Sequence, residues 1–161
     1  MTSKPAADAG GDGAPEAYRD LVERVRRIGN VGNAAGLLSW DQQVMMPEGG
    51  TPARSQQLSA LSAVKHDLLT DDTLGDLLDA VEGEVTGERA ALVREVRRDR
   101  ERAVRVPTDL VERISTASSE ALPAWREAKA EADFDAFAPH LRELVDLKRA
   151  YAEHVDPDRD P

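Results

Sequence analysis

The sequence predicts an all-α protein, a bundle of several helices. Apolar residues recur at spacings of three and four over most of the 161-residue chain, and this period places them on one face of a helix. No segment alternates polar and apolar residues over a useful length, and no Asn-Gly or Asp-Gly pair joins two β-rich runs. Only 4% of residues are aromatic, so aliphatic side chains must fill the core between the helices.

The first helix is expected to begin at Ala17 and to end near Trp40-Asp41. Its middle contains Gly29, Gly32 and Gly36, each of which weakens a helix by roughly 1 kcal/mol relative to Ala. We therefore expect these glycines to allow close packing against another helix.

The segment 45–52 is rich in helix breakers and should be a loop. The breakers are Pro47, Gly49, Gly50 and Pro52. A second helix follows, with apolar Leu58, Leu61, Val64 and Leu68. Either Thr70 or Asp71 can cap the short helix after it, and Gly83 and Gly87 bound the next turn.

The remaining sequence predicts three more helices. Residues 88–105 carry a thin apolar stripe surrounded by charge and should lie on the outside of the bundle, ending at Pro107. Residues 108–132 form another helix, in which Pro123 should cause a kink or a break. The last helix, about 135–154, should bury Phe137, Leu141, Leu144, Val145 and Tyr151.

These elements define one helical domain over residues 16–155. Residues 1–15 are rich in Ala, Gly, Asp and Pro and are expected to form a disordered tail. The ending Asp-Pro-Asp-Arg-Asp-Pro cannot form a packed element, so residues 156–161 should be a loop at which a longer chain is truncated.

Composition disfavours several classes of function. The net charge of −10 argues against a nucleic-acid partner, because phosphates would be repelled. No apolar run reaches the roughly 20 residues of a membrane-spanning helix. The chain has no cysteine, and the first fifteen residues lack the apolar core of a signal peptide, so we expect a cytoplasmic protein.

No catalytic or metal-binding residue can be assigned from the sequence. The three histidines, His66, His140 and His154, are too far apart to share a helical face at the spacing of an HExxH zinc motif. Carboxylates are so numerous that no pair stands out as an acid and base. We therefore expect this chain to bind no cofactor.

The run from Arg94 to Arg105 interleaves arginines with Glu95, Asp99 and Glu101. A solvated, salt-bridged helix face is the favoured interpretation. The alternative is a surface that docks an acidic partner or the remainder of a longer chain.

The pair Trp40-Asp41 stands directly before the breaker-rich segment. A carboxylate near a helix's carboxyl end is unfavourable, so a cation should offset it, and Arg54 is the nearest candidate. We predict an Asp41–Arg54 contact that anchors the loop, with Trp40 packed into the bundle. If the pair is partly buried, Asp41→Ala should cost about 2–4 kcal/mol.

Four stretches, in this order and spacing, resemble the amino-terminal part of M32 (carboxypeptidase Taq-like) metallocarboxypeptidases, over roughly residues 17–154. They are Trp40-Asp41 with Met45-Met46-Pro47 and Arg54; residues 94–99 leading into Val106-Pro107; Trp125 with Ala128-Lys129; and Asp133-Phe134 with Phe137-Ala138-Pro139. The structural signature of the resemblance comprises Trp40, Asp41, Arg54, Pro107 and Trp125.

The resemblance implies an all-helical homodimeric peptidase that removes carboxy-terminal residues from peptides. A divalent metal, usually zinc, is held in that family by HExxH and a downstream glutamate, which this sequence lacks. We therefore expect an amino-terminal fragment that is inactive alone, exposes an apolar face, and pairs with itself or with the missing carboxy-terminal part. The alternative is a free-standing helical module that binds a protein partner.

Overall fold

The computed structural model describes residues 13–158, which form six α-helices, one 3-10 helix and no strand. The α-helices are α1 (Glu16–Val44), α2 (Thr51–Thr70), α3 (Asp72–Ala80), α4 (Gly87–Val104), α5 (Thr108–Glu131) and α6 (Phe134–Val155); the 3-10 helix η1 (Glu48–Gly50) precedes α2. The predicted all-α class is confirmed. None of the described helices is long and apolar enough to cross a membrane.

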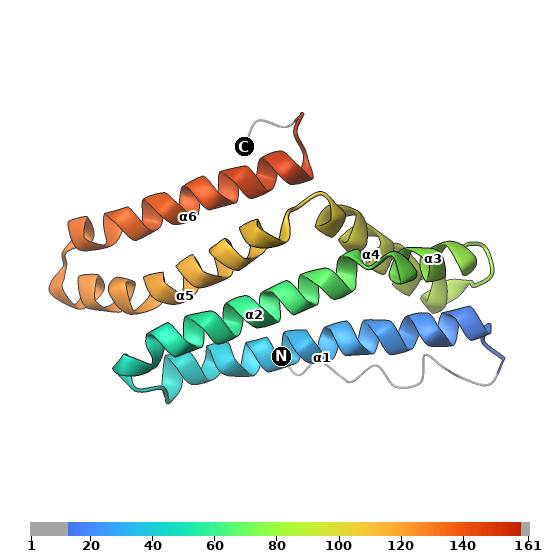
Figure 1. Ribbon diagram of the computed structural model, residues 1–161, viewed down its shortest axis with the longest axis horizontal. Coiled ribbons are helices and arrows are strands. Elements are labelled where there is room, and N and C mark those ends of the chain that lie inside the picture. The colour runs from blue at the N-terminus through green and yellow to red at the C-terminus, as the bar shows by residue number, and fades with distance from the viewer. Residues whose placement is uncertain (1–12, 159–161) are drawn as a thin grey trace.

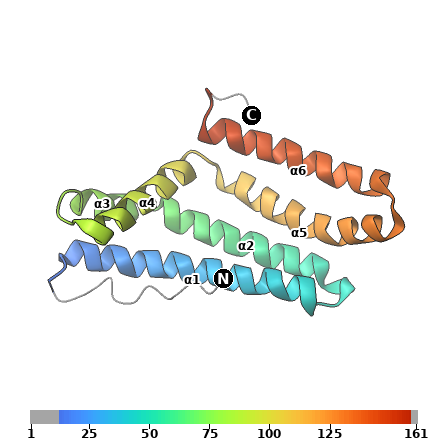
Figure 2. The same ribbon diagram turned by 180° about the vertical axis from the view of Figure 1, so that it is seen from behind.

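Four long helices lie side by side in the order α1, α2, α5 and α6, as both views show (Figures 1 and 2). Helices α3 and α4 gather at one end, beside the amino-terminal half of α1. Helix α6 is at the edge of this array and packs against α5. The arrangement therefore leaves one long side of both edge helices, α1 and α6, without a neighbouring helix.

The buried core is divided into two clusters. The larger joins α1, α3 and α4 and contains the most deeply buried side chains, Tyr18, Leu21, Leu74, Leu78 and Val81. The smaller lies between α5 and α6, around Val106, Leu110, Ala117 and Leu147. Ala14 packs into the larger cluster, so packed structure begins before Glu16; residues 1–12 of the predicted tail and 159–161 of the predicted terminal loop lie outside the described residues.

The connection between α1 and α2 is more ordered than the predicted loop over 45–52. Pro52 belongs to the first turn of α2, where its fixed φ suits a helix and its missing N–H is not needed. A Cβ on Gly50 would lie 2.9 Å from Cγ of Met46, so a larger residue there would require the Met46 side chain to shift. The breakers therefore end one helix, form η1 and begin the next.

No described helix packs closely against the glycines in the middle of α1. A Cβ built on Gly29 or Gly36 would meet no atom within 4 Å, and one on Gly32 would meet only the Lys65 side chain. Two of these glycines therefore face open space in the part of the chain that the structure describes.

Asp71, rather than Thr70, caps α3. Its side chain accepts a hydrogen bond from the backbone N–H of Thr73 at 2.8 Å. After α3 the chain turns at Gly83 and Gly87, with φ of 78° and 61°, a left-handed conformation that glycine adopts without strain.

The arginine-rich helix α4 is tied to α3 by salt bridges. Arg97 binds Asp79 at 2.8 Å and Glu82 at 3.2 Å, and it also donates to the carbonyl of Leu78. The salt-bridged interpretation is confirmed for this residue, and the bridges also hold two helices together.

Helix α5 runs through Pro123 without a break, and Asp133 caps α6 by accepting from the N–H of Ala136.

Leu147 is the buried residue of α6, whereas Leu141, Val145 and Tyr151 are exposed and Phe137 and Leu144 are half-buried. The prediction that all five are buried was wrong, because α6 has α5 as its neighbour on one side and solvent on the other.

Candidate functional site

The contact predicted between Asp41 and Arg54 is present. Arg54 Nη2 lies 2.5 Å from Asp41 Oδ2, and Nη1 donates to the carbonyl of Leu38. Arg54 Nε donates to Gln57 at 3.1 Å, so the guanidinium is held on three sides. The Arg54 side chain is 12% exposed and that of Asp41 is 35% exposed, so the pair is partly buried.

This pair fastens the last turns of α1 to the first turn of α2. Asp41 lies in the last turn of α1, where the negative end of the helix disfavours a carboxylate, and Arg54 offsets its charge. Two carbonyls near the end of α1 also gain partners, since Leu38 accepts from Arg54 and Asp41 accepts from the N–H groups of Met45 and Met46. These contacts connect the end of α1 to the start of α2.

Trp40 is not packed into the bundle, so that part of the prediction was wrong. Its side chain is 55% exposed, although it neighbours the buried corner in sequence. The helical period places residue 40 about 100° around the helix from residue 41. When Asp41 points towards α2, Trp40 therefore points to solvent.

The two other signature residues lie elsewhere. Pro107 immediately precedes α5, and its carbonyl accepts from the N–H groups of Leu110 and Val111 at 3.1 and 3.3 Å. This start of α5 is near the end of α2 that is remote from Arg54 (Figure 1). Trp125 is partly exposed, with Lys129 Nζ 4.8 Å from its ring centre. The five signature residues therefore do not converge on one site.

A buried polar contact that sequence reasoning missed connects α1 with α5. Gln42 Nε2 donates to the carbonyl and Oγ of Ser119, and Arg126 of α5 donates to the carbonyl of Gln43 at 3.0 Å. Gln42 follows the Trp40-Asp41 pair, but no local pattern identifies its partner 77 residues away. These contacts hold the end of α1 in a single orientation.

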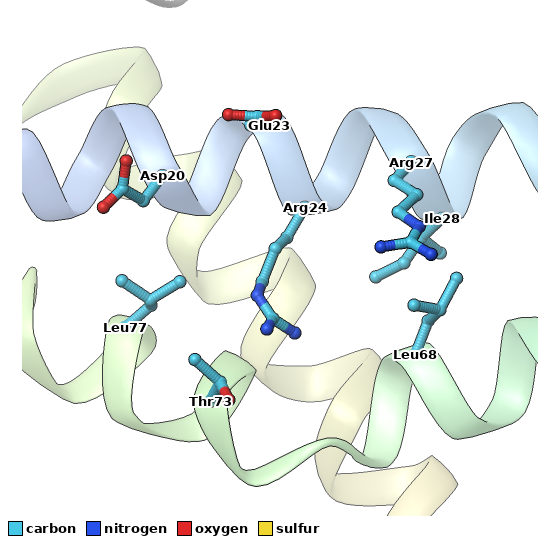
Figure 3. A pocket seen from close by; sticks show the side chains of 8 residues that line it. All are labelled: Asp20, Glu23, Arg24, Arg27, Ile28, Leu68, Thr73 and Leu77. Atoms are coloured by element: carbon cyan, nitrogen blue, oxygen red, sulfur yellow. The ribbon is translucent and has the colours of Figure 1, made fainter.

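The hollow between α1 and α3 has a volume of about 380 Å³ and is lined by both acidic and basic side chains (Figure 3). Arg24 extends from α1 towards Thr73, while Asp20 and Glu23 are on the same helix. The guanidinium of Arg24 is paired with Asp71 at 3.2 Å. Arg24, one of the two arginines that line the hollow, is therefore already paired with a carboxylate.

The described residues do not fit a catalytic metal. Residues 13–158 contain no group of three or more His, Asp or Glu side chains that could hold a metal ion. His66 is buried in α2, and His140 and His154 are both in α6. A catalytic zinc needs three converging protein ligands, which this part of the chain does not bring together.

Comparison with known proteins identifies the family. The family model described as "Carboxypeptidase Taq (M32) metallopeptidase" matches residues 20–161. Thermostable carboxypeptidase 1 of Thermus thermophilus is 34% identical over 145 residues, which are 86% of this chain and 28% of that protein.

Solved structures agree with this match. The crystal structure of BsuCP gives a TM-score of 0.86 at 21% identity, covering 91% of this chain and 30% of that one. The carboxypeptidase of Pyrococcus furiosus gives 0.68 at 31% identity, covering 88% and 29%. The chain thus spans less than a third of the length of these relatives. It belongs to the carboxypeptidase Taq (M32) metallopeptidase family.

Proposed function

We propose that this chain is the amino-terminal helical part of a metal-dependent carboxypeptidase, which removes residues from the carboxyl end of peptides, and that it is inactive alone. The observation that carries the proposal is the family match over residues 20–161, combined with coverage of only 28% of the Thermus thermophilus relative. The role of these helices is to form part of the body around the catalytic centre.

Inactivity of the chain alone is supported by the residues it lacks. Hydrolysis by a metallopeptidase needs a metal that polarises the peptide carbonyl and activates a water, and that metal needs ligands. The sequence has no HExxH and no cysteine, and its described residues form no metal-binding group. The polar clusters around Arg54 and Gln42 join helices, so they supply no substitute chemistry.

The alternative is a free-standing module that binds a protein partner, and it predicts a monomer without a large exposed apolar patch. Exposed large apolar side chains at the end of α1, such as Trp40 and Val44, argue against it.

The proposal is tested in two steps. The 161-residue chain is incubated with zinc or cobalt and a blocked dipeptide, and released amino acid and bound metal are measured. We expect neither turnover nor stoichiometric metal binding. Turnover that needs the metal and is abolished by a chelator would contradict the proposal.

The second step supplies the rest of the enzyme. In a chimera, this chain replaces the matching segment of the Thermus thermophilus carboxypeptidase, with which it shares 34% identity. We expect metal-dependent release of carboxy-terminal residues from the chimera. The relative without its matching segment is the control and should be inactive, because the body around its catalytic centre lacks these helices.

A further inference from the structure

Four apolar side chains form an exposed row at the carboxyl end of α1, here named the α1 apolar stripe: Leu37, Trp40, Val44 and Met45. Leu37, Trp40 and Val44 are three and four residues apart, so they share one face of the helix, and Met45 follows directly. Their exposed fractions are 64%, 55%, 58% and 67% in that order. Among the other large apolar residues that the structure describes, only Phe134 is exposed to this extent.

Two polar contacts set the orientation of the stripe. Gln42 is held by Ser119 of α5, and Asp41 is held by Arg54 of α2. Gln42 is two residues after Trp40, about 200° around the helix, so its contact with α5 turns Trp40 away from the bundle. Asp41 lies beside the stripe, and its contact with Arg54 fixes the same rotation of α1. Rotating α1 to bury the stripe would break both contacts, so the described helices keep the stripe exposed.

The same face continues towards the middle of α1 through two glycines. Gly36 is about one turn and Gly29 about three turns before Trp40, and neither has an atom within 4 Å of the place a Cβ would occupy. Glycines on a helix surface let another backbone approach closely. The face is therefore shaped for a packed neighbour that the described residues do not provide.

We infer that the α1 apolar stripe is the surface against which the remaining part of the carboxypeptidase fold packs. This inference rests on the proposed function. The unmatched part accounts for more than two thirds of each relative, because the chain covers 28% of the Thermus thermophilus protein and 29% of the Pyrococcus furiosus structure. A soluble protein seldom leaves such a row of large apolar side chains uncovered.

A second copy of this chain fits the stripe less well. A stable protein–protein interface buries about 800 Å² on each partner, which is more than four side chains on one helix supply. Each copy also carries a net charge of −10, so two copies repel each other. The unmatched part of the fold would belong to the same chain, so its contact with the stripe does not need the area of an interface between two separate chains.

The inference is tested by footprinting. Hydroxyl radicals oxidise exposed Trp and Met side chains, and mass spectrometry measures the rate at Trp40 and Met45 in the isolated chain and in the chimera with the Thermus thermophilus relative. We expect oxidation of both residues to be at least about fivefold slower in the chimera, since covered side chains exclude the radical.

A matched pair of variants tests the same point through stability. Val44 in the stripe and Val104 on α4 are the same residue type and are 58% and 53% exposed. In the isolated chain, Val44→Asp and Val104→Asp should change the melting temperature by similar small amounts. In the chimera, Val44→Asp should lower it by about 5 °C or more relative to Val104→Asp, because the charge is then buried.

The two proposals fail in different ways. A chimera that is active while Trp40 and Met45 react as fast as in the isolated chain would overturn the interface and leave the proposed function standing. An inactive chimera with both residues protected would support the interface and contradict the proposed function. In the isolated chain, oxidation of Trp40 and Met45 could instead slow as the protein concentration rises, with a dimer seen in sedimentation. That result would assign the stripe to a second copy and overturn the inference.

Discussion

The side-chain amide of Gln42 on α1 donates two hydrogen bonds to Ser119 on α5, one to its carbonyl oxygen at 3.0 Å and one to its Oγ at 2.8 Å. Both residues are buried, so neither group can exchange its partner for water. This contact joins two helices that are separated by α2 along most of their length (Figure 1).

Removing the Gln42 amide should therefore destabilise the chain. We expect Gln42→Ala to lower the free energy of unfolding by about 1–3 kcal/mol, because the buried Ser119 carbonyl loses its donor. The measurement is urea unfolding followed by circular dichroism. Gln43→Ala is the control: Gln43 is exposed and donates only to Ser39 of its own helix, so the loss should be below about 0.5 kcal/mol. Equal losses would show that the contact does not stabilise the fold.

The Asp41–Arg54 pair should show energetic coupling. Asp41→Ala is expected to cost about 2–4 kcal/mol, because it leaves a guanidinium that is only 12% exposed without its anion. A double-mutant cycle with Arg54→Ala separates this interaction from other effects of each change. The exposed pair Glu95–Arg98 is the comparison, with an expected coupling below about 0.5 kcal/mol. If the coupling energy of Asp41 and Arg54 is no larger than this, the pair does not anchor the connection between α1 and α2.

Stability should depend on pH through Asp71, the cap of α3. Hydrogen bonds from Thr73, with a smaller contribution from Arg24, hold the pKa of this carboxyl below its ordinary value. A pKa that is lower in the folded chain means that the carboxylate stabilises the fold at pH values above the unfolded pKa. That contribution is lost as the pH falls through the lower, folded pKa.

The difference in melting temperature between the parent chain and Asp71→Asn should therefore shrink between about pH 5 and pH 2. Asp146→Asn, on the exposed part of α6, serves as the control and should show a smaller difference at every pH. A difference for Asp71→Asn that is constant with pH would contradict the assigned cause.

The exposed stripe on α1 should bind a hydrophobic dye. We expect 8-anilinonaphthalene sulfonate to fluoresce with the isolated chain, and the double change Leu37→Ser with Trp40→Ser to reduce the signal at least twofold. The matched control changes Val64 and Val104 to Ser, two partly exposed apolar residues outside the stripe. If the control reduces dye fluorescence as much, the binding site lies elsewhere.

Much of the fold could be predicted because its signals are local. The recurrence of Tyr18, Leu21 and Val22, the breakers after Met46, and Pro107 before the next helix depend only on neighbouring residues. The Asp41–Arg54 contact was predictable for the same reason, since a short connection brings the two ends together. Gln42 and Ser119 are 77 residues apart, so their contact depends on the packing of three helices.

The sequence by itself determined where the helices lie, which residues share each face, and the family to which they are similar. Only the tertiary structure decided which of those faces is covered. Leu21 and Trp40 both follow the helical period, yet Leu21 is fully buried and Trp40 is mostly exposed. The physical reason is that periodicity fixes directions around a helix axis, whereas burial depends on a neighbour. Helices α3 and α4 cover the first half of α1, and no described helix covers the apolar stripe at its end.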